Sequence, residues 1–312
     1  MAFYHWKSLV NPVDLQQAKT DKLYVRLFDV DWNETTQFPE PLADVQRFSA
    51  FSKFKQVTPV VFLTNKTFEK LSESQLDRFV QQLFQKICRD TEGCYSEEIQ
   101  FDCDWTETTR DRYFAFLQRI KGVFFEKKIS ATIRLHQIKF MEKTGVPPVD
   151  RGMLMAYNMG DLDNLKTENS ILSVETLKQY VQKLGQYPVK LDVALPLFSW
   201  GVVFRDGAAT KLLNNLSQND ILQTPQYDSC FQKIADNRFV LLKNQYLKGL
   251  YLYKNDEIRI EDAPLSILTE TAQILSQNIN NQELTVAFYH LDSATLQKYR
   301  YEDLEKIVQS FK

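Results

Sequence analysis

The chain is poor in glycine, with nine in 312 residues, and it lacks the glycine-rich signatures that bind phosphate. It contains no G-x-G-x-x-G, no Walker-type loop, no G-x-S-x-G turn and no H-E-x-x-H zinc motif. Loops that wrap a phosphate need glycine for the close approach of the backbone. These absences argue against nucleotide chemistry, and the sequence predicts no cofactor.

An excess of charge and a cysteine framework are also missing. The 38 basic and 40 acidic residues leave a net charge of −2, whereas nucleic-acid-binding chains usually concentrate basic residues on one face. The four cysteines lack the C-x2-C spacing of a zinc site. Cys88 and Cys94 are expected to be reduced thiols, although an oxidising compartment would allow them to pair. We therefore expect no nucleic-acid partner and no bound metal.

No stretch approaches the roughly 20 apolar residues of a transmembrane helix, so no transmembrane segment is expected. The first residues, Met1 to Trp6, lack the charged start and the long apolar core of a secretory signal. Two locations stay open: the cytoplasm, or export as a periplasmic protein or lipoprotein whose signal has been removed. We expect the protein to be a monomer.

Strand-like and helical patterns alternate along the chain. The strand-like segments lie at about 2–7, 23–31, 58–64, 98–104, 130–138, 151–159, 188–196 and 283–291. Helical patterns include 72–88, 108–125, 174–184 and 301–311. This alternation implies a parallel sheet, which is either an open doubly wound sheet or a closed barrel. The count of eight and the final helix favour a single (β/α)8 barrel of the α/β class.

The stretch from about 200 to 282 is too long for one crossover connection. It contains strand-like pieces at 239–242 and 249–253 and a helical pattern at 265–275. No linker rich in proline, glycine or serine separates it from the rest. We predict one barrel domain over residues 1–312, with 200–282 as an insertion between strands seven and eight that packs on the barrel.

Acidic side chains recur at two predicted strand ends, in the segments Phe28-Asp29-Val30-Asp31-Trp32 and Phe101-Asp102-Cys103-Asp104-Trp105. Because alternate residues of a strand face the same side, Asp29, Asp31, Asp102 and Asp104 are predicted to point into the barrel near its C-terminal mouth, where barrel active sites lie. Arg134 and His136 of the fifth strand and Asp192 of the seventh are predicted to join them. The alternative is a structural ion-pair network, in which Arg134 and Lys190 neutralise these acids.

Within this cluster, Arg134 is expected to neutralise the deeper Asp102, which leaves Asp104 above it for a ligand.

Tryptophan and histidine gather at the same strand ends. All four tryptophans, Trp6, Trp32, Trp105 and Trp200, follow predicted strands, where an indole ring can stack on the apolar face of a sugar. The alternative is packing under loops, with the indole N–H bonded to the backbone. The three histidines, His5, His136 and His290, also lie at or near strand ends, and His5 and His290 are expected to be close together. No local ligand spacing supports a metal site among them.

The order of these motifs resembles that of the family 18 chitinase-like barrels. There the fourth strand ends in D-x-x-D-x-D-x-E and the sixth carries an M-x-Y-D-like segment, which correspond here to Phe101–Trp105 and Met155–Met159. Asp102 and Asp104 match the second and third acids of the family motif. Ile99 stands at the first acid, Thr106 stands at the catalytic glutamate with Glu107 one residue later, and Asn158 replaces the aspartate.

The resemblance implies a glycoside-hydrolase-like barrel that takes a carbohydrate or another small polar ligand but lacks the complete acidic motif. The chain also resembles a bacterial family of exported barrels over most of its length.

Together these observations predict a carbohydrate-active hydrolase that cleaves a glycosidic bond with mouth carboxylates. The candidate catalytic residues are Asp104, Glu107, Asp102, Asp31 and Asp192. The candidate substrate-binding residues are Trp6, Asp29, Trp32, Trp105, His136, Tyr157, Asn158, Trp200 and His290. Two alternatives stay open: a barrel that binds a glycan or cell-envelope component without cleaving it, favoured by Thr106, and a metal-dependent hydrolase that uses the histidines.

Overall fold

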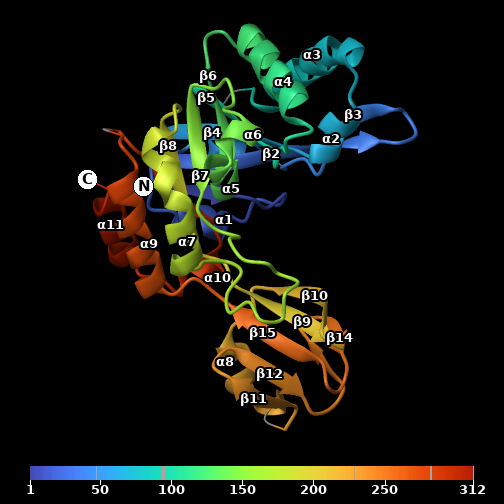
Figure 1. Cartoon of the computed structure of the whole chain (residues 1–312), viewed down its shortest axis with the longest axis vertical. Coiled ribbons are helices and arrows are strands. Elements are labelled where there is room, and N and C mark those ends of the chain that lie inside the picture. The colour runs from blue at the N-terminus through green and yellow to red at the C-terminus, as the bar shows by residue number, and fades with distance from the viewer. Residues whose placement is uncertain (47, 93–95, 228, 282, 312) are drawn as a thin grey trace. The chain divides into compact units, whose positions relative to one another are not determined.

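The computed structural model describes residues 1–46, 48–92, 96–227, 229–281 and 283–311 (Figure 1). Cys94, and with it the question of a bridge to Cys88, lies outside these residues. The chain divides into two compact units. The first comprises residues 1–156, 178–195 and 272–312, and the second comprises residues 157–177 and 196–271.

The first unit is built around eight parallel strands that form a closed sheet. These are β1 (Ala2–His5), β2 (Lys22–Asn33), β4 (Gln56–Leu63), β5 (Glu98–Asp102), β6 (Lys128–Arg134), β7 (Arg151–Met155), β8 (Leu191–Pro196) and β16 (Val286–Tyr289). Closure is achieved by β1, which pairs in parallel with both β2 and β16. A short strand, β3 (Phe38–Leu42), extends β2 as an antiparallel hairpin. The predicted (β/α)8 barrel is confirmed.

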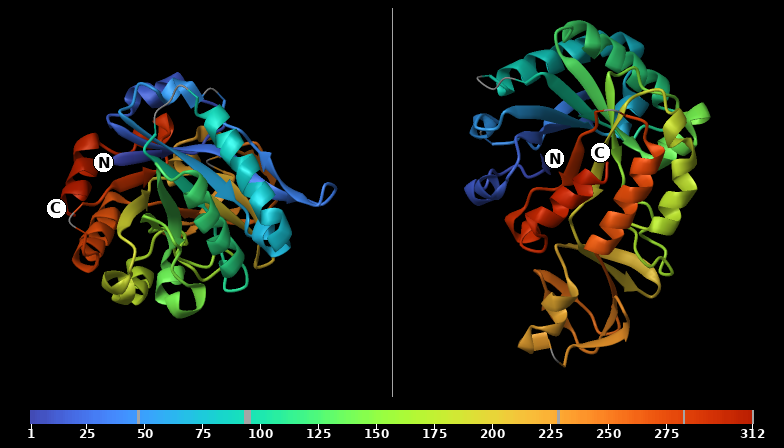
Figure 2. Two further views of the ribbon diagram at one scale, coloured as in Figure 1. Left: turned by 90° about the horizontal axis from the view of Figure 1, so that it is seen from above. Right: turned by 90° about the vertical axis from the view of Figure 1, so that its left-hand side faces the viewer.

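Helices cover the outside of this barrel (Figure 2). They are α1 (Pro12–Gln17), α2 (Asn65–Lys70), α3 (Glu73–Asp90), α4 (Arg110–Val123), α5 (Leu135–Lys139), α6 (Met141–Thr144), α10 (Ser293–Leu296) and α11 (Tyr301–Gln309), with 3-10 turns at Phe48–Phe51 and Val181–Gln186. α3 begins at a capping box formed by Ser72 and Gln75. Its buried Phe79 packs on Phe116 of α4 at 5.4 Å between ring centroids. Each such buried side chain stabilises the fold by about 1.5–3 kcal/mol.

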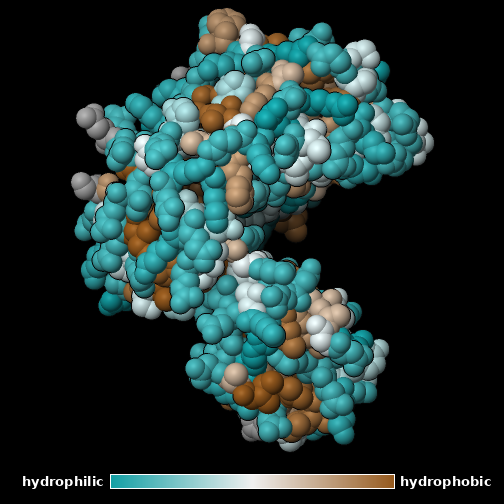
Figure 3. All heavy atoms as spheres, viewed as in Figure 1, coloured by the Kyte–Doolittle hydropathy of each residue, from teal (hydrophilic) through white to brown (hydrophobic). Residues whose placement is uncertain are grey.

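Two further helices, α7 (Val174–Tyr180) and α9 (Leu265–Asn278), each contribute residues to both units. In the part of the chain that the structure describes, no helix combines the length and apolar character needed to cross a membrane. On the face drawn in Figure 3, hydrophilic residues dominate and apolar residues form separate patches.

The second unit contains a five-stranded antiparallel sheet whose strands lie, in the chain, between β8 and β16. In spatial order its strands are β10 (Ala208–Asn214), β9 (Trp200–Arg205), β15 (Glu257–Glu261), β12 (Arg238–Leu241) and β11 (Phe231–Ala235). It is accompanied by α8 (Gln218–Leu222), a 3-10 turn at Pro225–Tyr227, and the hairpin of β13 (Gln245–Leu247) and β14 (Leu250–Leu252). Its core includes Val203, Phe239 and Ile258. The packing of this segment on the barrel, within one domain, stays a prediction.

The barrel interior is polar, whereas its outward side chains pack against the helices. Inside, the Tyr4 hydroxyl donates to Gln100 Oε1 at 2.5 Å, and Gln100 Nε2 donates to Ser130 Oγ at 3.3 Å. Outside, Phe101 meets Phe116 of α4 with ring centroids 5.3 Å apart. A register shift in β2 between Arg26 and Phe28 interrupts the simple alternation along that strand.

We predict that Gly152→Ala destabilises the protein by about 1–3 kcal/mol, because it overpacks the barrel wall. A Cβ added to Gly152 on β7 would lie 2.4 Å from Ile133 Cδ1 and 2.9 Å from Leu191 Cδ2. At Gly122 on α4 an added Cβ meets nothing within 4 Å beyond its own helix, so Gly122→Ala should stabilise by roughly 0.5–1 kcal/mol. Urea unfolding of both variants tests this. Equal stability of Gly152→Ala and wild type would contradict the close packing.

Candidate functional site

Asp102 is the last residue of β5 and points into the barrel, where its carboxyl group is almost completely enclosed. The residue is 4% exposed, and its Oδ1 accepts a hydrogen bond from Thr132 Oγ1 at 2.6 Å. Burial raises the pKa of this carboxyl to about 6, because the charged form loses its hydration. The positive charge of Arg134 opposes that rise, while the carboxylates of Asp104 and Asp29 add to it. Asp102 is therefore a proton-holding acid at mildly acidic pH.

Asp104 lies two residues beyond β5 and has a different environment. Its side chain is 53% exposed, and its Oδ1 accepts from Nε of Arg134, the last residue of β6, at 2.5 Å. The expectation that Arg134 pairs with the deeper Asp102 is wrong, whereas contact of the exposed Asp104 with a ligand stays a prediction. β5 ends at Asp102, so the chain carries Asp104 outward, where the arginine at the end of β6 meets it.

A second group of side chains lies on β1, β2 and β16. Arg26 forms an ion pair with Asp29, with Nε 2.6 Å from Oδ1, and its guanidinium carbon lies 5.9 Å from the centre of the Trp6 ring. The half-buried Trp6 also contacts the ring of Tyr289 at 5.7 Å. Burial raises the pKa of Tyr289, and the charge of Asp102 is the next largest cause. These contacts bring Trp6 and Asp29 into one group of side chains, and their role in ligand binding stays a prediction.

Arg26 and Tyr289 were not predicted from the sequence as members of this group. Tyr289 precedes the His290 that was singled out, and its contacts with Trp6 and Tyr4 show that it faces the barrel interior. Arg26 is brought to Asp29, three residues later, by the register shift in β2, which a two-residue alternation does not reveal. The signal available for Tyr289 was the repetition of Phe3-Tyr4-His5 as Phe288-Tyr289-His290.

Asp31 and Glu107 have peripheral environments. Asp31 Oδ1 accepts from Thr64 Oγ1 at 2.6 Å and from the Trp32 backbone N–H at 2.8 Å, so it supports the turn that leads into α2. Glu107 is exposed in the turn before α4, beside the exposed Thr106. Their predicted catalytic roles stay predictions.

Asp192 does not lie at the mouth. It is the second residue of β8 and sits near the opposite, N-terminal end of the barrel strands, with its side chain 1% exposed. Its Oδ1 is 2.5 Å from Arg151 Nη1 and accepts from the Thr285 N–H at 2.7 Å. Burial raises the pKa of this carboxyl, and the Thr285 N–H and Arg151 oppose the rise. The ion-pair partner of Asp192 is therefore Arg151 and not Lys190. The prediction that Asp192 lies at the mouth is wrong, because β8 begins at Leu191 and Asp192 is only its second residue.

Two of the four tryptophans are packed inside the first unit. Trp105 is 1% exposed, stacks on Tyr113 at 5.4 Å and donates its indole N–H to the Thr144 carbonyl at 2.8 Å. Trp32 is buried opposite Pro39 in the β2–β3 hairpin. Because both side chains are buried, the prediction that they present a ring to a ligand is wrong. The alternative of packing with the indole N–H bonded to the backbone is confirmed for Trp105.

The histidines do not form one cluster at the mouth. His5 is fully buried against the Phe51 ring at 4.9 Å, and the charge of His290 acts on it, so these two lie close together as expected. His136 is exposed on α5, because β6 ends at Arg134 and the predicted strand does not continue. Burial lowers the pKa of His290, which follows Tyr289. Among the described residues, no three His, Cys, Asp or Glu side chains are grouped to hold a metal ion.

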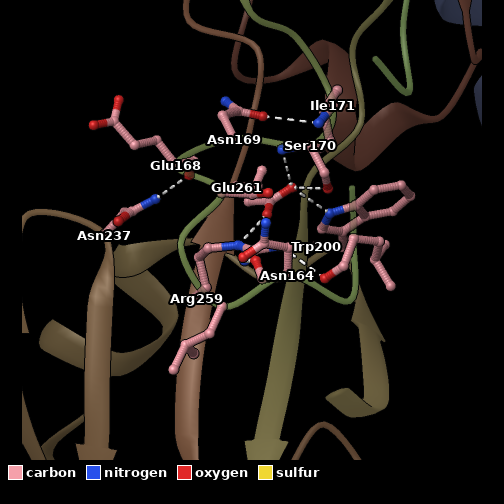
Figure 4. Close-up of polar contacts among 12 residues, drawn as sticks. Asn164, Glu168, Asn169, Ser170, Ile171, Trp200, Asn237, Arg259 and Glu261 are labelled. Carbon is pink, nitrogen blue, oxygen red and sulfur yellow. Dashed lines mark hydrogen bonds and ion pairs between the residues drawn. The ribbon is translucent and has the colours of Figure 1, made fainter. Parts of the chain in front are cut away.

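Three further candidates belong to the second unit. Tyr157 is buried, with its ring 5.7 Å from that of Phe198 in an edge-on contact. Asn158 is exposed and has a positive φ of 53°. Trp200 is half-buried and donates its indole N–H to Glu261 Oε2 at 2.8 Å (Figure 4). Their contribution to ligand binding stays a prediction, as does that of His136 and His290.

We predict that Asp102→Asn stabilises the protein at neutral pH and has little effect near pH 4. Folding raises the pKa of Asp102 from 3.8 to about 6, so the folded protein binds the proton more tightly than the unfolded chain. The resulting stabilisation is complete below the unfolded pKa of 3.8 and is lost as the pH rises through about 6. The stability difference between Asp102→Asn and wild type should therefore grow by about 3 kcal/mol between pH 4 and pH 7, at about 1.4 kcal/mol for each pKa unit.

Denaturant unfolding at a series of pH values measures this difference, with Asp104→Asn as the control from the same strand end. Parallel curves for wild type and Asp102→Asn would contradict the assignment. Removing Asp102 leaves Arg134 its ion pair with Asp104, so the large loss of stability expected from an uncompensated cation does not apply.

Comparison with solved structures places this barrel among known ones. The spore cortex-lytic enzyme SleL of Bacillus cereus aligns with a TM-score of 0.61 and 13% identity over 100% of this chain and 74% of that chain. A chitinase from Chromobacterium violaceum aligns with a TM-score of 0.62 and 10% identity over 99% of both chains. The chitinase RmChi1 from Rhizomucor miehei aligns with a TM-score of 0.58 and 12% identity, covering 98% of this chain and 99% of that one.

No family model and no curated protein matches the chain. At 10–13% identity the structural likeness concerns the fold. The chain has a glycoside-hydrolase-like (β/α)8 fold, similar to that of the family 18 chitinase-like barrels.

Proposed function

We propose that the barrel mouth binds a carbohydrate and cleaves a glycosidic bond with the carboxyl groups of Asp102 and Asp104. The observation that carries the proposal is that two carboxyl groups at one strand end have contrasting surroundings. Asp102 is buried, which raises its pKa to about 6, whereas Asp104 is 53% exposed and forms an ion pair with Arg134. Glycoside hydrolysis requires one protonated and one ionised carboxyl group beside the scissile bond.

Each carboxyl group then has a separate task. Asp102 gives its proton to the leaving glycosidic oxygen as the C–O bond breaks. The Asp104 carboxylate either attacks the anomeric carbon or takes a proton from the attacking water, depending on the separation of the two carboxyl groups. This assignment gives Asp102 the acid role that Thr106 cannot fill, because a threonine hydroxyl does not release its proton in this pH range.

Ligand binding relies on the neighbouring side chains. The half-buried Trp6 ring offers an aromatic surface for the apolar C–H face of a sugar ring. The Arg26–Asp29 pair beside it offers hydrogen-bond donors and acceptors for sugar hydroxyls. Chitin and peptidoglycan fragments are suitable first substrates, because proteins with this fold include chitinases and a spore cortex-lytic enzyme.

We predict that Asp104→Asn and Asp102→Asn each lower kcat/KM by at least 100-fold, since a missing general acid or base typically costs 10²–10⁴-fold. Wild-type activity should fall as the pH rises above about 6, where Asp102 loses its proton. Hydrolysis of aryl glycosides, chito-oligosaccharides and peptidoglycan fragments measures both effects. The matched control is Asp21→Asn, which removes an exposed carboxylate paired with Lys55 away from the mouth. Full activity of Asp104→Asn would exclude this mechanism.

A second candidate function is glycan binding without cleavage. Two observations favour it: Thr106 occupies the position of the family's catalytic glutamate, and Asp104 is engaged by Arg134. A glycan-binding array run beside the activity screen separates the two functions. Binding that requires Trp6, with no turnover on any substrate, selects the second function, whereas turnover excludes it.

A further inference from the structure

A buried carboxylate in the second unit has four hydrogen-bond donors around it. Glu261, the last residue of β15, is completely enclosed, and so is its ion-pair partner Arg259 (Figure 4). Glu261 Oε2 accepts from the Ser170 backbone N–H at 2.9 Å, from the Ser170 hydroxyl and from the Trp200 indole N–H at 2.8 Å. The two carboxyl oxygens of Glu261 thus accept from all four of these donors.

The same ion pair holds the segment 157–177, which follows the sixth barrel strand, at several points. Arg259 donates to the carbonyls of Asn164 at 2.7 Å and Leu162 at 3.0 Å. Ser170, which Glu261 holds, accepts at its carbonyl from the Gly160 N–H at 3.1 Å. The next residue, Ile171, accepts at its carbonyl from the Asn158 N–H at 2.8 Å. Glu261 therefore holds Ser170, and the backbone of Ser170 and Ile171 in turn bonds to Gly160 and Asn158.

Glu261 also binds one of three aromatic side chains that pack against one another. It holds the Trp200 indole, whose ring lies 5.1 Å from Phe198, and Phe198 meets Tyr157 at 5.7 Å. Trp200 keeps part of its ring exposed, and Asn158 exposes its side chain. One buried carboxylate therefore holds a half-buried indole directly and the backbone of a residue with an exposed amide indirectly. Such groups bind sugar faces and sugar hydroxyls.

We propose that Glu261 is a positioning residue for glycan binding, which preforms the binding surface of Trp200 and Asn158. The ligand class rests on the proposed function. A surface that is ordered before the ligand arrives avoids the entropy cost of ordering it on binding, so affinity depends on a residue that the ligand does not touch.

Hydrogen–deuterium exchange tests the positioning role without any ligand. In Glu261→Gln an amide N–H₂ faces donors and Arg259 loses its counter-charge, so the amides of Asn158 and Gly160 should exchange at least tenfold faster, with barrel amides such as Val193 unchanged. The control is Asp256→Asn, which changes another buried carboxylate of the same unit, paired with Arg205. It should leave Asn158 and Gly160 unchanged. Unaltered exchange at Asn158 in Glu261→Gln overturns the inference.

A milder variant keeps the test decisive if Glu261→Gln does not fold. Ser170→Ala removes one donor to Glu261 and retains the backbone bond, so the amide of Gly160 should exchange severalfold faster. Exchange as slow as in wild type would again overturn the inference.

Calorimetric titration with chitohexaose and with a peptidoglycan disaccharide-peptide tests the consequence for binding. Glu261→Gln should weaken binding of the fragment that wild type prefers at least tenfold, while Asp256→Asn binds like wild type. Faster exchange with unchanged affinity overturns the role in binding. If wild type binds neither fragment, the proposed function fails, and the exchange experiment still decides whether Glu261 orders the segment.

Discussion

A carboxylate inside a closed barrel must be neutralised or protonated, and this constraint organises the first unit. Toward the N-terminal end of the strands, Lys22 lies 3.2 Å from Glu98 and Arg151 lies 2.5 Å from Asp192. Toward the mouth, Arg26 pairs with Asp29 and Arg134 pairs with Asp104. Within the described residues, Asp102 makes no direct ion pair and meets the constraint through its raised pKa. The ion pairs thus stabilise Asp29, Asp104 and Asp192 by direct contact with arginine, whereas burial raises the pKa of Asp102 to about 6.

This arrangement combines the two interpretations that the sequence left open. A structural ion-pair network exists, and it includes Asp192 and Asp29, which pattern alone placed in a reactive cluster. The same network leaves Asp102 and Asp104 in contrasting environments at one strand end. The fold is similar to that of chitinases and a spore cortex-lytic enzyme. Thr106 stands where the resemblance noted in the sequence places a catalytic glutamate, so the proposed hydrolysis assigns the acid role to Asp102.

Strand periodicity predicted the barrel and most of its strands. The outer face of each parallel strand is buried against helices, so apolar residues recur along the whole strand. The periodicity failed where a strand end or a bulge decides the position of a side chain. β5 stops at Asp102 and β6 at Arg134, so Asp104 moves outward and His136 joins a helix. Trp105 turns into the space between helices because Tyr113 and the Thr144 carbonyl offer it a partner. Such choices depend on contacts distant in the sequence.

The central claim is that burial without a direct ion pair lets Asp102 keep its proton up to about pH 6. Carbon-13 NMR of aspartate-labelled protein measures it directly, with the Asp102 resonance assigned by its disappearance in Asp102→Asn. The account predicts that this resonance titrates near pH 6, well above the ordinary 3.8. Titration of the Asp102 resonance below pH 4 would contradict the account, because the mouth would then hold no protonated carboxyl group to serve as an acid.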